Sequence, residues 1–227
     1  MPHRLERELD HIKKRILALG GMVEERVRMA IKAIEKKNGE LANEIRRRDY
    51  EIDEQEVEVE EECLKILALH QPVAVDLRFL IAVIKINNDL ERIGDQAVNV
   101  AKRVHSIAER ERMEISMDYA LMAEKAATML KWSLDALVNL DLQLAIKVMK
   151  MDDQVDNIHC QNYDYLKEII RRAPEHVDYL INFLTISRHL ERIADHATNI
   201  AQEVIFMIEG EIVRHGKWDA GTKEADF

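Results

Sequence analysis

The sequence of 227 residues is poor in the residues that break helices. It has seven glycines and three prolines, whereas a strand-rich fold of this length would need many more turn residues. Hydrophobic residues make up 47% of the chain and charged residues 33%, a balance that excludes a disordered chain. The composition therefore predicts an all-α protein built from long helices.

Cysteine is also scarce, and long apolar runs are missing. Cys63 and Cys160 are isolated, with no C-x-x-C pair and no histidine at zinc-finger spacing. The first residues form no apolar signal segment, and no stretch approaches ~18 uninterrupted apolar residues. These absences predict a cytoplasmic protein that does not insert into a membrane.

Positive charge is in deficit. The formal net charge is -10, and the arginine run from Arg46 to Arg48 is followed at once by acidic residues. Phosphate backbones are bound by concentrated Lys and Arg, so nucleic acid is excluded as the main partner. The sequence also lacks the Walker A motif, the dinucleotide-binding glycine motif and the G-x-S-x-G elbow. We therefore expect no enzymatic activity.

Apolar residues spaced by three or four predict six long antiparallel helices. Turn signals at Asn38-Gly39, Pro72, Leu140-Asp141, Pro174 and Gly210 separate them. Asp76 is the expected N-cap of the third helix. The helices are expected over residues 5–34, 40–69, 76–111, 117–139, 142–172 and 176–209.

The second half repeats the first. Residues 88–101 read NDLERIGDQAVNVA and residues 188–201 read RHLERIADHATNIA, while DYEID at 49–53 is echoed by DDQVD at 152–156. Such self-similarity indicates internal duplication. We predict two tandem three-helix bundles, over residues 1–113 and 114–210, followed by a flexible tail over 211–227.

Acidic residues four apart recur at matching places in both halves. On a helix this spacing puts two carboxylates on one face. The preceding helix of each half carries a similar pair, and counting from the proline turn places the pairs at similar heights on antiparallel helices. Four carboxylates are thus expected to converge in each half, with one asparagine a turn further on. The predicted ligands are Asp49, Asp53, Glu91, Asp95 and Asn99 in the first half, and Asp152, Asp156, Glu191, Asp195 and Asn199 in the second.

Four converging carboxylates repel one another unless they are protonated or bridged by a cation. Carboxylate and amide ligands without thiolate suit hard or borderline ions such as Mg, Mn, Ca or Fe. Gly94 and Ala194, between the paired acids, would let a helix or an ion approach closely. Glu56 and His159, at matching positions one turn along, could be outer ligands or surface residues.

Two other interpretations remain open. One is a di-metal oxidase of the ferritin-like class, for which Glu8-x-x-His11 supplies one E-x-x-H element, although that architecture needs the element twice. The other is a helical scaffold whose acidic rows only keep it in solution, as single charge pairs on helices usually do. Bound iron that reacts with dioxygen would favour the first, and metal independence the second.

The paired L-E-R-I-[GA]-D-x-A-x-N-[IV]-A helices, the D-x-x-x-D helices and the turn HQPVAVDLR resemble the PhoU family. These proteins regulate phosphate uptake and accompany the bacterial Pst phosphate transporter. The resemblance covers about residues 1–210, and the two LERI[GA]D helices are its most specific part. The second half has RAPEHVDYL in place of the turn, so the role of the turn is carried over only for Pro72, Asp76 and Arg78.

The resemblance implies a cytoplasmic, homodimeric negative regulator with no catalytic reaction. Such a protein links the ATPase subunit of the Pst transporter to a sensor histidine kinase that controls phosphate-starvation genes. It also implies metal ions on the acidic motifs, with iron as the family's suggestion and Mg, Mn or Zn as alternatives. Those motifs map onto Glu91/Asp95 and Glu191/Asp195, with Asp49/Asp53 and Asp152/Asp156 facing them.

Overall fold

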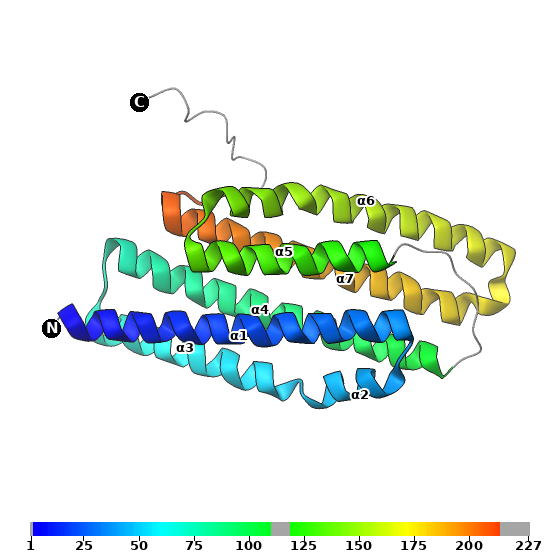
Figure 1. Ribbon diagram of the computed structural model, residues 1–227, viewed down its shortest axis with the longest axis horizontal. Coiled ribbons are helices and arrows are strands. Elements are labelled where there is room, and N and C mark those ends of the chain that lie inside the picture. The colour runs from blue at the N-terminus through cyan, green and yellow to red at the C-terminus, as the bar shows by residue number, and fades with distance from the viewer. Residues whose placement is uncertain (1, 110–118, 214–227) are drawn as a thin grey trace, which may run out of the picture.

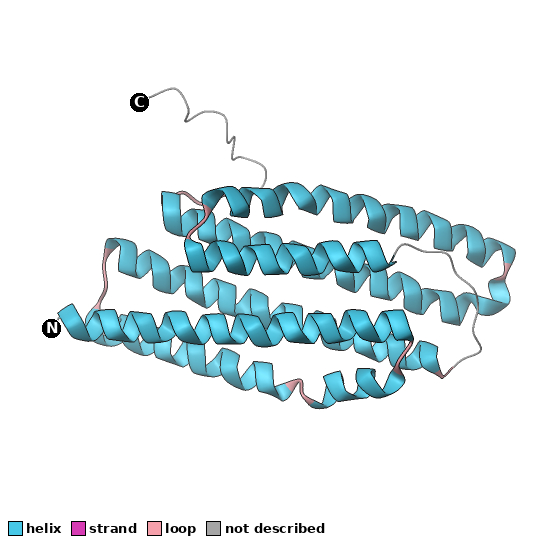
Figure 2. Cartoon of the chain, in the orientation of Figure 1, coloured by secondary structure: helices cyan, strands magenta, loops and turns pink. Residues whose placement is uncertain are grey.

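The computed structural model describes residues 2–109 and 119–213, and the described residues are helical except for short turns (Figures 1 and 2). The helices run along the length of an elongated molecule (Figure 1). The elements are α1 Pro2–Lys36, α2 Gly39–Arg47, α3 Tyr50–His70, α4 Ala74–Ala108, α5 Tyr119–Asn139, α6 Leu142–Arg172, the 3-10 turn η1 Pro174–His176 and α7 Val177–Glu209. The all-α duplicated architecture expected from the sequence is confirmed.

Equivalent turns begin α2 and α6. Lys37 and Leu140 have left-handed backbones, with φ of 47° and 49°. The next residue in each turn is an N-cap, where Asn38 accepts hydrogen bonds from the amides of residues 40 and 41, and Asp141 accepts one from the amide of residue 144. Short polar side chains stabilise helix starts in this way. The turns signalled by the sequence therefore end one helix and begin the next.

The expected helix over 40–69 is in fact two helices, α2 and α3, separated at Arg48 and Asp49. The buried side chain of Arg26 stabilises this break. Its Nη1 donates to the Ile45 carbonyl oxygen at 3.1 Å, and its Nη2 donates to Glu51 at 3.0 Å. A carbonyl at a helix end lacks its intrahelical partner, and the guanidinium replaces it.

The prediction that Asp76 caps the third helix was wrong. Helix α4 begins at Ala74, with Val73 in the N-cap position, so Asp76 lies in the first turn. There its negative charge interacts favourably with the helix dipole. The proline turn does end α3, where Gln71 adopts a left-handed backbone before Pro72.

The end of α7 contacts the start of α4. Gly210 ends α7 with a φ of 75°, as the sequence signal predicted. A Cβ at this position would collide with the guanidinium of Arg78, from the turn region of the first repeat. Val213 is buried just beyond. The expected boundary at residue 113 and most of the expected tail, residues 214–227, lie outside the described residues.

The two halves pack along α4 and α7, which make the most extensive contact between any two described helices. Buried residues such as Leu90 and Ile93 on α4, and Leu190 and Ile193 on α7, belong to one continuous core. The LERI segments therefore lie at the centre of the molecule, flanked by α3 and α6, which carry the other acidic rows.

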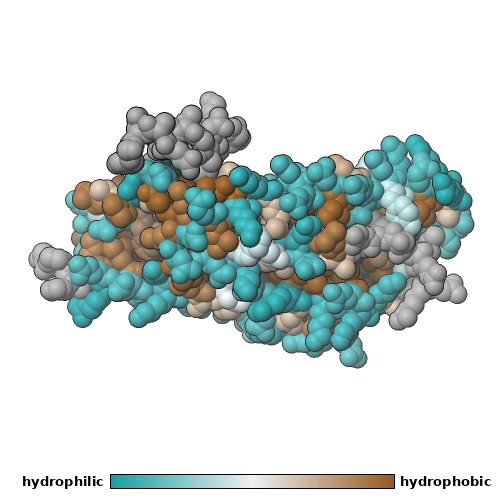
Figure 3. Space-filling view, turned by 45° about the horizontal axis from the view of Figure 1, so that its top comes forward, coloured by the Kyte–Doolittle hydropathy of each residue, from teal (hydrophilic) through white to brown (hydrophobic). Residues whose placement is uncertain are grey.

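Figure 3 shows hydrophilic side chains over most of one face, with hydrophobic ones gathered toward the end that carries the N terminus. Within the described ranges, no helix is both long and apolar enough to cross a lipid bilayer.

Candidate metal centre

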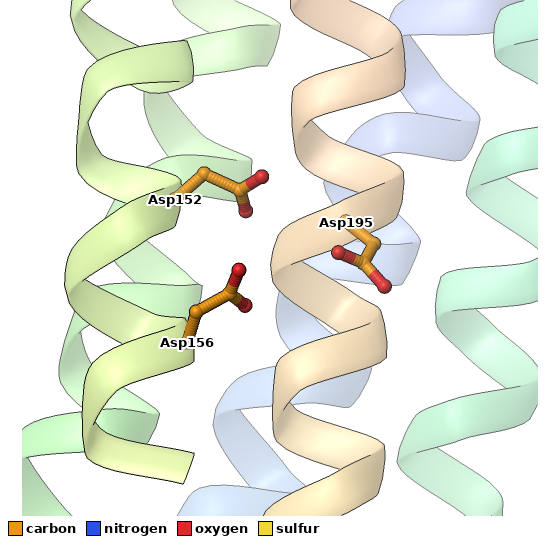
Figure 4. Close-up of side chains that lie close together, drawn as sticks. All are labelled: Asp152, Asp156 and Asp195. Atoms are coloured by element: carbon orange, nitrogen blue, oxygen red, sulfur yellow. The ribbon is translucent and has the colours of Figure 1, made fainter. Parts of the chain in front are cut away.

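Three carboxylates of the second half converge between α6 and α7. Asp152 and Asp156 lie one turn apart on α6 and point toward α7, which contributes Asp195 (Figure 4). One carboxylate oxygen from each residue lies within 4.8 Å of the others. Oxygens at this separation can contact one ion, because Mg²⁺ and Ca²⁺ bind carboxylates at ~2.0–2.6 Å.

The three carboxylates and Glu191 perturb one another. Burial raises the pKa of Asp152 to about 6, and the charges of Asp195 and Asp156 add to the effect. Burial likewise raises the pKa of Asp195 to about 6, together with repulsion from Glu191 and Asp156. The pKa of Glu191 is also raised, by burial and by Asp156. All four side chains thus share one electrostatic site.

The first half brings its four predicted carboxylates into mutual range as well. Burial raises the pKa of Asp49, and Asp53 and Asp95 raise it further. Burial also raises the pKa of Glu91, with added repulsion from Asp95 and Asp53. Among the described residues, however, only the second half has three carboxylates within 4.8 Å of one another. The first cluster is the more open of the two.

The two asparagines lie at the edges of the clusters, where other residues contact them. Asn99 Oδ1 accepts a hydrogen bond from Lys102 at 3.1 Å. Asn199 donates to Asp89 at 3.1 Å, which leaves its own amide oxygen for another contact. Their role as ligands stays a prediction.

Of the two possible outer ligands, His159 is the better placed. Its Nδ1 lies 2.9 Å from Ser187 Oγ. Burial lowers the pKa of His159, which favours the neutral imidazole that a metal needs. Burial raises the pKa of Glu56, as do the charges of Glu60 and Asp53, so Glu56 is within electrostatic range of the first cluster.

The second cluster fits a cation by its unsatisfied groups. Asp152 Oδ1 is buried and accepts no hydrogen bond of normal geometry among the residues that the structure describes, although the neighbouring Thr198 hydroxyl lowers the pKa of Asp152. A buried carboxylate oxygen without a partner is costly, and a cation would satisfy it. An all-carboxylate set of this kind is typical of sites for Mg, Mn or Fe ions.

Gly94 has the packing role expected of it. A Cβ on Gly94 would lie 2.9 Å from Ile52 Cδ1, so its absence lets α3 approach α4 closely. In the second half Ala194 and Val155 take the equivalent positions and are buried. A smaller partner side chain there compensates for the extra methyl group.

The Glu8-x-x-His11 element does not reach either cluster. Glu8 contacts His70 Nε2 at 2.8 Å, and His11 lies 3.6 Å from Glu62. Both residues of the element therefore contact α3 rather than a shared metal position, which removes the support for a ferritin-like site.

Sequence reasoning missed a polar network between the repeats. His196 contacts Asp89 at 2.8 Å, and His189 contacts Gln96 at 2.7 Å. Lys85 donates to both carboxylate oxygens of Glu203 at 3.0 Å. The spacing of seven between the two histidines placed them on one face, but the residues opposite them could not be inferred without the packing of α4 on α7.

Comparison with known proteins gives a consistent family match. A profile of the PhoU domain matches residues 16–104 and again residues 119–204. The chain is 36% identical over 209 residues to the phosphate-specific transport system accessory protein PhoU homologue of Pseudomonas aeruginosa, covering 92% of this chain and 86% of that protein. Identity to the homologue of the same name in Clostridium acetobutylicum is 34%, over 92% of this chain and 95% of that one.

Solved structures agree with the sequence matches. The crystal structure of PhoU from Pseudomonas aeruginosa aligns with a TM-score of 0.88 at 34% identity, covering 91% of this chain and 99% of that one. The phosphate transport system regulatory protein PhoU from Streptococcus pneumoniae aligns with a TM-score of 0.83 at 29% identity, covering 93% and 100%.

Proposed function

Since the chain belongs to the PhoU family, we propose that it is a metal-binding regulator of phosphate uptake and of phosphate-starvation signalling. Its relatives are named as accessory proteins of the phosphate-specific transport system, and a role in regulating phosphate transport follows from that kinship. The observation that carries the metal-binding part is the convergence of Asp152, Asp156 and Asp195 within 4.8 Å.

The ion is held by the carboxylates of the two clusters. In the second half, Asp152, Asp156 and Asp195 are the ligands, with Glu191 beside them. In the first half, Asp49, Asp53, Glu91 and Asp95 hold a second ion. A cation offsets the mutual repulsion that raises the pKa values in both clusters, and magnesium, manganese or iron suits the ligand set.

The regulator acts by contact rather than by catalysis. We propose that it binds the ATPase subunit of the Pst transporter and a sensor histidine kinase as a cytoplasmic homodimer, and that it represses phosphate-starvation genes when phosphate is plentiful. The acidic clusters lie on the outer helices α3 and α6 as well as on α4 and α7, so that bound cations would change the charge of surfaces open to a partner.

Metal content tests the first part of the proposal. Protein purified without chelator or affinity tag is analysed by inductively coupled plasma mass spectrometry, beside Asp95→Asn/Asp195→Asn and the control Glu61→Gln/Asp164→Asn. The control removes two exposed carboxylates from α3 and α6. We expect stoichiometric metal in the wild type and the control, and loss in the first variant. Equal or negligible metal in all three would reduce the acidic rows to solvated helix faces.

Gene expression tests the regulatory part independently. Deleting the gene in its host should derepress phosphate-scavenging genes in phosphate-rich medium, and the wild-type gene should restore repression. Complementation with Asp95→Asn/Asp195→Asn should fail, whereas the Glu61→Gln/Asp164→Asn control should succeed. Unchanged expression after deletion, in a host without a second copy, would refute the regulatory role.

A further inference from the structure

A hollow of 580 Å³ opens at the contact between α4 and α7, beside the second acidic cluster. Both repeats line it, because α4 contributes two residues, α6 one and α7 the rest. The lining residues that matter here are Arg92, Gln96, Asp152, Arg192, Asp195 and His196. Arg92 and Arg192 are equivalent residues of the two LERI segments.

The two arginines lie beside the contacts that join the repeats, with Arg92 exposed and Arg192 half-buried. Asp89 on α4 contacts His196 on α7, and Gln96 on α4 contacts His189 on α7. Asp89 and His189 are equivalent positions of the two repeats, as are Gln96 and His196, so the two helices cross in an antiparallel sense. On α4, Arg92 lies three residues after Asp89 and four before Gln96. On α7, Arg192 lies three residues after His189 and four before His196. Residues three and seven apart share a helix face, so both arginines lie on the faces that meet.

Neither arginine forms an ion pair with a carboxylate in the part of the chain that the structure describes, although Arg92 is within electrostatic range of Glu91, and Arg192 is within range of Glu191 and Asp195. Arg92 Nε donates to the neutral Asn88 amide oxygen at 3.0 Å, and no ion pair joins Arg92 or Arg192 to an acid within 4.0 Å. By contrast, Arg15, Arg26 and Arg48 all pair with glutamates. A guanidinium stays charged at any pH relevant here, so the pair offers several donors to an anion.

Several cationic side chains lie around His189, which contacts Gln96 in the lining of this hollow. Burial lowers the pKa of His189 to about 4, and Arg192, Arg103, Arg188 and Lys102 all contribute to the lowering. These cations are within electrostatic range of His189, whereas the carboxylates Asp152 and Asp195 line the hollow itself.

We propose that Arg92 and Arg192 together bind a phosphate-type oxyanion, with inorganic phosphate as the ligand, in this hollow between the repeats. Planar guanidinium groups match phosphate oxygens in pairs. Asp152 and Asp195 line the same hollow and repel an anion until a cation neutralises them, so phosphate binding depends on metal. In this respect the inference rests on the proposed metal site.

Equilibrium dialysis with radiolabelled inorganic phosphate tests this site on the full chain loaded with Mn²⁺. The test variant is Arg92→Gln/Arg192→Gln. The control, Arg171→Gln/Arg172→Gln, removes the same charge from the end of α6, ~30 Å along the helix from Asp152. We expect saturable binding to the wild type, at least about tenfold weaker binding to the test variant and less than about twofold change in the control. Competition with glycerol phosphate and sulfate distinguishes free phosphate from a phosphate ester and from any oxyanion.

The manganese content of each dialysed sample separates the two proposals. If Mn²⁺ is retained and the wild type binds no phosphate, or the test variant binds it equally well, the arginine site is refuted while the metal site stands. If Mn²⁺ is not retained, the metal site fails, and the Asp152→Asn/Asp195→Asn variant, which lacks both negative charges of the hollow, is dialysed with and without Arg92→Gln/Arg192→Gln. Phosphate binding that is lost when the arginines are replaced would support the arginine site, and absence of binding to the Asp152→Asn/Asp195→Asn variant would refute it.

Discussion

The two repeats carry equivalent carboxylate rows on helices that are built differently. In the second half α6 is continuous through Asp152 and Asp156, which places both carboxylates on one regular face beside Asp195. In the first half the chain breaks at Arg48, so Asp49 precedes α3 instead of lying within a helix. The two copies of the duplicated motif therefore differ in how closely their carboxylates approach one another. The carboxylates lie farther apart in the half where the helix is interrupted.

The interruption is traced to one residue of α1. Asn38 and Asp141 are equivalent caps, and counting back 12 residues from each reaches Arg26 and Met129. Met129 is buried among apolar side chains, whereas Arg26 is buried and hydrogen-bonded to the broken segment. A buried arginine requires partners, and the break provides a carbonyl and a carboxylate.

The largest effect is expected from removing that arginine. Arg26→Met leaves the Ile45 carbonyl without its donor, and we expect a loss of about 2–4 kcal/mol in the free energy of unfolding by urea. The matched control is Arg48→Met, which removes the more exposed partner of the same Glu51 and should cost less than about 1 kcal/mol. Equal costs for the two variants would show that Arg26 does not stabilise the break.

The pH dependence of stability should differ between the two clusters. The pKa values of Asp152 and Asp195 are raised from 3.8 to about 6, so the folded protein binds protons that the unfolded chain does not. Their protonation therefore stabilises the metal-free protein below about pH 4, and this contribution is lost as the pH rises through 6. We expect Asp152→Asn/Asp195→Asn to raise the Tm at pH 7 by a few degrees.

Thermal unfolding between pH 4 and pH 7 in the presence of chelator measures this difference. Asp49→Asn/Asp95→Asn is the matched variant in the first half and should change the curve less. If both variants follow the wild-type curve of Tm against pH, repulsion between the ionised carboxylates of the second cluster does not destabilise the metal-free protein.

The smallest effect concerns the helix contact beneath each cluster. Gly94→Ala brings a methyl group against Ile52, and overpacking of this kind costs about 1–3 kcal/mol, which the higher helix propensity of alanine offsets by about 1 kcal/mol. Adding Ile52→Val reproduces the Ala194 and Val155 pair of the second half. A double-mutant cycle should give a favourable coupling of about 1 kcal/mol, and additive effects would contradict the compensation.

Much of this structure follows from local signals in the sequence. The helices follow from apolar spacing, the turns from Asn38, Pro72 and Asp141, and the duplication from repeated letters. The approach of the acidic rows followed from their spacing of four on antiparallel neighbours. These features depend on residues close in sequence or on simple counting along a helix.

The remaining features depend on contacts between distant segments. The residues around Arg48 are compatible with a helix, and the break there depends on Arg26 from another helix. The presence of Arg92 and Arg192 in the lining of one hollow depends on how α4 packs on α7, which sequence periodicity does not determine. The same holds for the closer grouping of carboxylates in the second half.

The most direct test of the difference between the two clusters is a crystal structure of the protein equilibrated with limiting Mn²⁺, with the ions located by anomalous scattering. We expect an ion bound by Asp152, Asp156 and Asp195 at a concentration where the first cluster is still weakly occupied, with the first cluster filling as Mn²⁺ increases. An ion only at Asp53 and Asp95, or no ion in either cluster at saturating Mn²⁺, would contradict the proposed metal centre.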